Sequence, residues 1–146
     1  MASRSLDDLH PSVRERAVAW KKDCSDAGIE VLIYCTYRSA AEQDELYKVG
    51  RTVKGEGVTA KRPMGRTVTN ARGGNSLHQY RCAWDCVPMS GGKPQWNDAA
   101  TYKRMASIAK KHGIEWAGEW VSFKEQAHFQ FTNGLTLAEL KQGKIP

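Results

Sequence analysis

The 146-residue sequence lacks any run approaching the roughly 18 consecutive apolar residues that a membrane-spanning helix needs. Its first residues, MASRSLDDLHPSV, also lack the apolar segment of a secretory signal peptide. We therefore expect no transmembrane segment, and synthesis in a cytoplasm without export by that route. The hydrophobic share of 40% and the charged share of 26% are ordinary for a globular protein, and the length favours one domain over residues 1–146.

Cysteine is sparse, and its spacing is not that of a zinc knuckle. Four cysteines are present: Cys24, Cys35, Cys82 and Cys86. The last two are separated by three residues rather than by the two of a knuckle. On a strand over 82–87, both would share a face with Trp84, and Asp85 would lie on the opposite face. Without an export signal, we expect reduced, buried cysteines with a structural role.

Basic residues are in excess, but they are not concentrated in one place. The chain has 22 lysines and arginines against 16 aspartates and glutamates, a formal net charge of +6. A basic balance favours an anionic partner such as a nucleic acid, a membrane surface or an acidic polymer. Because no cluster combines basic with aromatic side chains, we expect no nucleic-acid partner; a sharp salt dependence of DNA binding would revive that interpretation.

Apolar periodicity and turn residues predict an α+β domain. Helices are expected over 11–27, from Ser39 to Gly50 and over 99–112, with a short terminal helix over 135–143. Glu42 lies three residues after Ser39 and predicts a capping box. Strands or extended segments are expected over 29–37, 82–87, 114–123 and 127–131, and Pro88 should end the second of them. This order favours a small, mostly antiparallel sheet with helices packed on it.

A long segment between the predicted second helix and second strand has no helical periodicity. Residues 51–77 carry five glycines and one proline. Long loops inside compact domains are usually functional or disordered. The sequence leaves both alternatives open for residues 51–75, a flap over a cleft or a disordered loop.

Histidine is as sparse as cysteine, and two of the four histidines have ordinary explanations. His10 precedes the first predicted helix, and His112 lies in the last turn of another, where a positive charge suits the helix dipole. His78 and His128 do not fit so easily. A metal site that cleaves amides needs three protein ligands, an open position for water and a carboxylate base.

Two acidic residues, together with these histidines, could complete such a set. His78, Asp85 and His128 could supply the ligands, and Glu125, three residues before His128, could supply the base. The alternative is a surface histidine with a solvated aspartate, and the spacing by itself does not decide between them.

The string SLHQYRCAWD, residues 76–85, resembles the S-x-H-x-x-G-x-A-x-D motif of the zinc D,D-peptidase-like family, peptidase family M15. EWAGEWVSFKEQAHFQF, residues 115–131, is similar to that family's second motif, in which an acidic residue precedes the last zinc histidine by three. TYRSAAEQDELYKVGRT, residues 36–52, is similar to its upstream arginine segment. The resemblance implies a D,D-peptidase or Hedgehog-like α+β fold with a zinc site in a cleft.

Carried over residue by residue, the resemblance implies one zinc ion per chain, bound by His78, Asp85 and His128. Glu125 matches the general base that takes a proton from the attacking water and later protonates the leaving amine. The matched residues are thus the same as those of the hypothetical metal set.

Arg38 and Ser76 match two further motif residues. Arg38 corresponds to the arginine that binds the scissile carbonyl oxygen, where a fixed cation stabilises the developing negative charge; the alternative is a surface arginine at a strand end. Ser76 corresponds to the motif serine, a contact to the substrate or to a neighbour, and an ordinary loop serine is equally open. One departure is Arg81, which replaces the motif glycine and puts the local loop geometry in doubt.

Three tryptophans could be taken for a sugar-binding surface. They are Trp84, Trp116 and Trp120. We expect core packing instead, because Trp84 lies on the strand face away from Asp85.

The family includes enzymes that cut different bonds of peptidoglycan. The compact length, with no separate wall-binding domain, and the strings named above are most similar to phage endolysins that cut the L-alanyl-D-glutamate bond of stem peptides. Such an enzyme stays in the host cytoplasm until a holin opens the membrane, then acts in the periplasm or cell wall. We expect a monomer whose charge favours the anionic envelope. The alternatives are a D,D-carboxypeptidase, a D-Ala-D-Ala dipeptidase and a non-catalytic wall-binding module.

Overall fold

An antiparallel sheet with two helices on one face organises the chain. The computed structural model describes residues 2–120 and 124–146. Within them the sheet has five strands: β1 (Glu30–Cys35), β2 (Ala83–Ser90), β3 (Lys93–Pro94), β4 (Glu115–Trp116) and β5 (His128–Gln130). Their order is β1-β2-β5-β4, and β3 pairs with the far end of β2. The predicted α+β class with a mostly antiparallel sheet is therefore confirmed.

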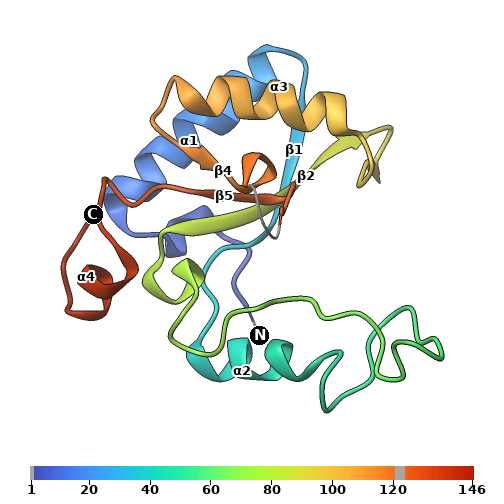
Figure 1. Cartoon of the computed structure of the whole chain (residues 1–146). Coiled ribbons are helices and arrows are strands. Elements are labelled where there is room, and N and C mark those ends of the chain that lie inside the picture. Colours follow the sequence, from blue (N-terminus) through green and yellow to red (C-terminus); the bar gives the residue numbers. More distant parts are fainter. Residues whose placement is uncertain (1, 121–123) are drawn as a thin grey trace.

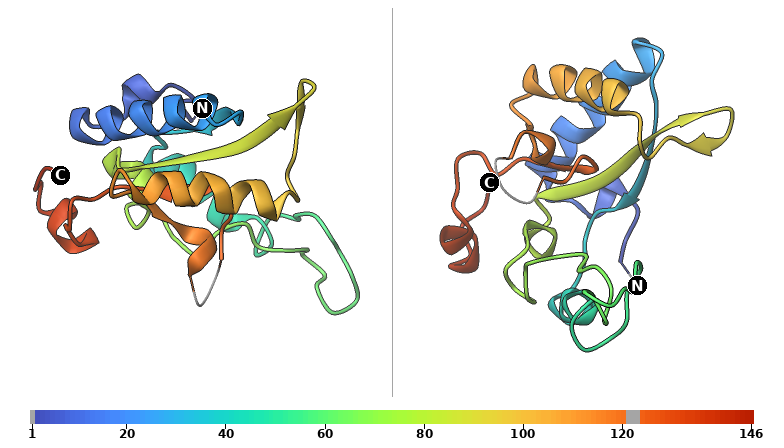
Figure 2. Two further views of the ribbon diagram at one scale, coloured as in Figure 1. Left: turned by 90° about the horizontal axis from the view of Figure 1, so that it is seen from above. Right: turned by 45° about the vertical axis from the view of Figure 1, so that its right-hand side comes forward.

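Helices α1 (Pro11–Asp26) and α3 (Ala99–Lys110) lie side by side over one face of the sheet (Figure 1). Helix α2 (Ala40–Lys48) and the long loop after it lie on the opposite side, and α4 (Leu137–Lys141) lies near the C-terminus (Figures 1 and 2). Short 3-10 helices are η1 (Leu6–Asp8), η2 (Leu77–Tyr80) and η3 (Ala117–Glu119). The side of the sheet that faces away from α1 and α3 is thus left for a site.

The core forms where α1 and α3 meet the sheet. In α1, apolar residues at three- and four-residue steps are all buried: Val13, Ala17, Trp20 and Cys24. The Trp20 ring lies 4.9 Å from the Phe129 ring and 5.7 Å from the Trp84 ring, and its indole N–H donates to the Met105 carbonyl at 2.9 Å. The predicted buried and free cysteines are confirmed at all four positions.

Two predicted strand boundaries are wrong for identifiable reasons. Pro88 does not end β2, which continues to Ser90. Beyond residue 85, β5 no longer pairs with β2, and on that edge the Pro88 carbonyl accepts from the Gln95 amide at 2.9 Å. Since the nitrogen and the carbonyl of a strand residue point to the same edge, the missing amide hydrogen of Pro88 removes no bond from the β1–β2 ladder. The extended segment 114–123 contains only the two residues of β4 before the chain turns into η3; its last part, 121–123, lies outside the described residues.

Helix α2 begins with the predicted capping box. The Ser39 hydroxyl accepts from the Glu42 amide at 3.1 Å, and the Glu42 carboxylate accepts from the Ser39 amide at 3.0 Å. Because both end groups are satisfied at this point, the helix starts directly after the segment that carries Arg38. The cap therefore determines where the β1–α2 connection turns.

One end of the long loop is tied to α2. Gln43 donates to the Thr69 hydroxyl at 3.2 Å and to the Ala71 carbonyl at 2.9 Å, and the Asp44 carboxylate accepts from the Gly73 amide at 2.7 Å. Residues 69–73 are therefore a fixed wall beside the sheet. Among the residues that the structure describes, no helix is long and apolar enough to span a membrane.

We predict that Phe129→Ala lowers the free energy of unfolding by about 3–5 kcal/mol, because the ring is fully buried among three tryptophans and its loss leaves a cavity. Denaturant unfolding followed by circular dichroism measures the change. Val18→Ala is the control, since Val18 is 50% exposed on α1 and should shift stability by no more than about 0.5 kcal/mol. Equal effects of the two substitutions would contradict this description of the core.

Candidate metal centre and active site

A cavity of about 1480 Å³ lies on the face of the sheet to which Asp85 points, opposite the buried Trp84 and Cys86. Its walls come from β1, β2 and β5, from α2 and from residues 68–72 of the long loop. All six residues predicted for the site line this cavity: Arg38, Ser76, His78, Asp85, Glu125 and His128. Segments far apart in the sequence therefore meet in one place.

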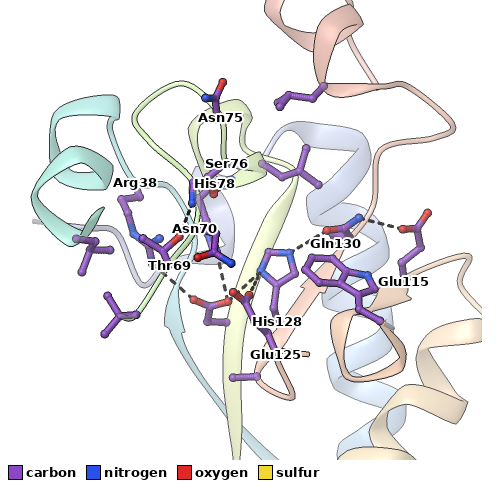
Figure 3. A pocket seen from close by; sticks show the side chains of 18 of the residues that line it. Arg38, Thr69, Asn70, Asn75, Ser76, His78, Glu115, Glu125, His128 and Gln130 are labelled. Atoms are coloured by element: carbon purple, nitrogen blue, oxygen red, sulfur yellow. Dashed lines mark hydrogen bonds and ion pairs between the residues drawn. The ribbon is translucent and has the colours of Figure 1, made fainter. Parts of the chain in front are cut away.

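Asp85 lies at the centre of the group. Its Oδ1 is 3.3 Å from Nε2 of His78 and 3.3 Å from Nδ1 of His128. The two imidazole rings stand edge to face with centroids 5.3 Å apart. His128 reaches Asp85 because the two residues are direct partners in the pairing of β2 with β5. His78 reaches it from η2, which precedes β2 (Figure 3).

Each histidine is oriented by a bond on its other nitrogen. Nδ1 of His78 donates to the Thr36 carbonyl at 2.7 Å, which leaves Nε2 directed at Asp85. Nε2 of His128 lies 2.9 Å from Oε1 of Gln130, whose amide in turn donates to Glu115 at 2.9 Å. Outer partners of this kind set the tautomer and ring orientation of metal-binding histidines.

Charge stabilises the Asp85–His78 pair in the absence of a metal. Burial alone would lower the pKa of His78, but the charge and hydrogen bond of Asp85 outweigh it and raise the pKa to about 10. Burial alone would raise the pKa of Asp85, but the two histidines hold it well below its usual range. A cation at this position therefore has to displace protons from imidazole.

Three donor atoms converge here: Nε2 of His78, Oδ1 of Asp85 and Nδ1 of His128. Imidazole nitrogens with one carboxylate oxygen are ligands that suit zinc. A second grouping, in which ligand atoms lie within 4.8 Å of one another, joins Cys35 to His78 and Asp85. However, the Cys35 sulfur approaches Nδ1 of His78, at 3.8 Å, and that nitrogen already donates to Thr36. The first set is the better-directed one.

Glu125 stands beside the donor set without joining its centre. Its Oε2 lies 3.7 Å from Nδ1 of His128, and 33% of its side chain remains exposed to the cavity. Burial raises the pKa of Glu125, the negative charge of Asp85 adds to this, and the histidines oppose it. A carboxylate with a raised pKa at the edge of a cavity has the properties of a proton acceptor.

Arg38 is held on three sides. One guanidinium nitrogen donates to Oε1 of Gln43 at 2.9 Å, while the other donates to the sulfur of Cys35 at 3.2 Å and lies 3.6 Å from Oδ2 of Asp85. Its side chain is 14% exposed, so it is not the surface arginine of the alternative interpretation. The backbone carbonyl of Arg38 also accepts from Gln79, at 3.0 Å.

Ser76 caps the short helix that presents His78. Its hydroxyl accepts from the His78 amide at 3.3 Å, and the Gln79 side chain accepts from the Ser76 amide at 3.0 Å. Arg81, at the motif glycine position, takes the left-handed conformation with φ of 61°. The unusual backbone angle expected at this position is therefore present, and the Arg81 side chain is held outside the cavity by the Asp8 carbonyl at 2.8 Å.

Sequence reasoning missed the residues that support the site. Gln43, Cys35 and Gln130 each contact one of the predicted residues through a side chain. No sequence signal marked them: Gln43 looks like any polar helix residue until the structure shows that it is buried. Trp84 and Trp116 are buried as predicted, but Trp120 is not in the core. Its ring lines the cavity 5.6 Å from the His128 ring.

A sequence profile of peptidase family M15, described as D-alanyl-D-alanine carboxypeptidase, matches residues 69–131. The peptidoglycan L-alanyl-D-glutamate endopeptidase CwlK of Bacillus subtilis (strain 168) is 39% identical over 132 residues, which are 84% of this chain and 73% of the relative. The L-alanyl-D-glutamate peptidase of Listeria phage A118 is 30% identical over 134 residues, 88% of this chain and 41% of the relative.

The fold has a counterpart among solved structures. The vancomycin resistance D,D-pentapeptidase VanY from a VanB-type resistance cassette, in complex with Zn(II), superposes with a TM-score of 0.65 at 14% identity. The match covers 94% of this chain and 80% of that one. Together with the identity to the Bacillus relative, the fold and the site show that the chain is a metallopeptidase of family M15.

Proposed function

We propose that this chain is a zinc peptidase that hydrolyses the L-alanyl-D-glutamate bond of peptidoglycan stem peptides. The observation that carries the proposal is the convergence of two imidazoles on Asp85 next to Glu125 and Arg38. The bond is taken from the Bacillus relative, an L-alanyl-D-glutamate endopeptidase that is 39% identical to this chain. Fold likeness alone would leave a D,D-carboxypeptidase equally open.

The residues fit one zinc ion. His78, Asp85 and His128 supply two neutral nitrogens and one anionic oxygen, and each histidine is oriented by its other nitrogen. The VanY structure of the same fold contains Zn(II). When bound, the ion supplies Lewis acidity, which lowers the pKa of water to about 7 and polarises a carbonyl.

The chain's own residues then account for the proton and charge transfers. Glu125 takes a proton from the attacking water as the water oxygen bonds to the alanyl carbonyl carbon. Arg38 donates to the carbonyl oxygen, which gains negative charge, and its fixed guanidinium needs no reorganisation to do so. As the C–N bond breaks, Glu125 returns its proton to the leaving amine of D-glutamate.

We further propose a role in host-cell lysis as a phage endolysin. The relative from Listeria phage A118, at 30% identity, supports this role. The +6 charge would favour retention on the anionic envelope. On this proposal the enzyme stays in the host cytoplasm until a holin opens the membrane, and it then acts on the wall as a monomer.

Glu125→Gln is expected to keep stoichiometric zinc and to lower kcat by about 10²–10⁴-fold, because the amide cannot accept the proton of water. Peptide release measured by liquid chromatography and zinc measured by mass spectrometry give the two readouts. Glu119→Gln is the matched control, since Glu119 is exposed in an ion pair with Lys110. Normal turnover by Glu125→Gln would show that Glu125 is not the general base.

His78→Ala is expected to lose bound zinc after dialysis and to lower the Tm measured with zinc present, because metal binding is coupled to folding. His112→Ala serves as the comparison: His112 bonds Asp23 at 2.7 Å, outside the cavity, and its loss should leave zinc content unchanged. Unchanged zinc content in His78→Ala would show that His78 is not a ligand.

Digestion of purified peptidoglycan should release peptides that begin with D-glutamate, and a chelator should abolish the release. Mass spectrometry of the products identifies the bond. Loss of terminal D-alanine alone would show that the enzyme is a carboxypeptidase rather than an endopeptidase. If the zinc-loaded protein releases no product, a non-catalytic module is favoured. A parallel digestion of intact cells should proceed only when their membranes have been permeabilised, as an endolysin requires.

A further inference from the structure

Two apolar side chains are exposed near Tyr34, a residue that lines the cavity. Trp96, between β3 and α3, is 51% exposed, and Leu32 on β1 is 42% exposed. Along β1 burial alternates, so that Leu32 and Tyr34 share the side opposite the buried Val31 and Ile33. Exposed apolar side chains that form a contiguous patch often mark a site of contact with a partner or ligand.

Tyr34 joins this pair of residues to the cavity. The Trp96 and Tyr34 rings meet edge to face with centroids 5.3 Å apart, and Tyr34 also lines the cavity together with Asp85. A bulge in the β1–β2 pairing falls at Tyr34, and bulges beside active sites often re-aim a side chain. Burial first, and the negative charge of Asp85 second, raise the pKa of Tyr34, so the phenol stays neutral near the site. Leu32, Tyr34 and Trp96 thus form one uncharged surface, the aromatic platform.

The chemistry of the substrate requires such a neighbour. In peptidoglycan the L-alanine of the stem peptide is attached to the lactyl group of N-acetylmuramic acid. An extended chain advances about 3.3–3.6 Å per residue, so the sugar begins roughly one residue from the scissile carbonyl. A peptidase that cuts L-alanyl-D-glutamate in the intact polymer therefore has to accommodate glycan immediately beside its metal site.

The two parts of that substrate differ in charge. The stem peptide beyond the cut carries free carboxylates, and the cavity lining includes the basic Arg38, Arg72 and Lys124 besides the acidic Asp85, Glu115 and Glu125. The glycan is neutral where its amines are acetylated, and one face of each sugar ring presents C–H groups. Such a face packs on an aromatic ring through dispersion and burial. The platform matches the sugar, and the basic side chains match the peptide.

We propose that Leu32, Tyr34 and Trp96 form a subsite for the N-acetylmuramyl sugar on the amino-terminal side of the scissile bond. This inference rests on the proposed L-alanyl-D-glutamate activity. It adds to that activity a preference for peptides still attached to glycan over free stem peptides.

The test compares the affinity of the zinc-loaded protein for two ligands. One is the disaccharide GlcNAc–MurNAc carrying the tetrapeptide, and the other is the same tetrapeptide without sugar. Affinities are measured by calorimetry in the Glu125→Gln background, so that no turnover intervenes. We expect the parent to bind the disaccharide peptide about tenfold more tightly, Trp96→Ala to abolish that preference, and Trp96→Phe to restore most of it. Val18→Ala, an exposed apolar change on α1, should keep the parent's preference.

The outcomes separate the platform from the proposed function. A parent without preference, or a Trp96→Ala protein that weakens both probes equally, would overturn the sugar subsite even if the L-alanyl-D-glutamate bond is cut. If the wild-type protein cleaves its substrate at another bond, the proposed function is overturned instead. The ratio of the two affinities would still decide whether the platform binds sugar.

Discussion

The site depends on one carboxylate, Asp85, placed between two imidazoles. A buried carboxylate is costly unless several donors or positive charges surround it, and here His78, His128 and Arg38 do so within 3.6 Å. The same requirement makes the cluster a candidate cation site, because a metal ion there would replace the protons that otherwise compensate the charge. The geometry of the site follows from that compensation.

Strand β2 connects the site to the core. Trp84 and Cys86 face the interior with no exposed surface, while Asp85 between them faces the cavity. Since alternation along a strand has a period of two, one slip in register would exchange these faces. The pairing of Asp85 on β2 with His128 on β5 therefore fixes the packing of the core and the geometry of the candidate metal centre at the same time.

The other side of the cavity depends on hydrogen bonds rather than on apolar packing. Gln43 accepts from Arg38 and donates to the loop at Thr69 and Ala71. One buried amide thus positions the Arg38 guanidinium and also the loop segment that forms part of the same cavity wall. Such a network is cooperative, since removal of one member leaves the others without partners in a partly dry environment.

Local patterns alone indicated the helices, the approximate strand positions and four candidate site residues. The steps of Val13, Ala17, Trp20 and Cys24, and the capping box at Ser39, act over a few residues and can be read directly. Motif resemblance extended that set to six residues, all of which line the cavity. The register, the continuation of β2 through Pro88, the cavity position of Trp120 and the partners of Arg38 were decided only in the tertiary structure. They depend on contacts between segments tens of residues apart, which no local periodicity encodes.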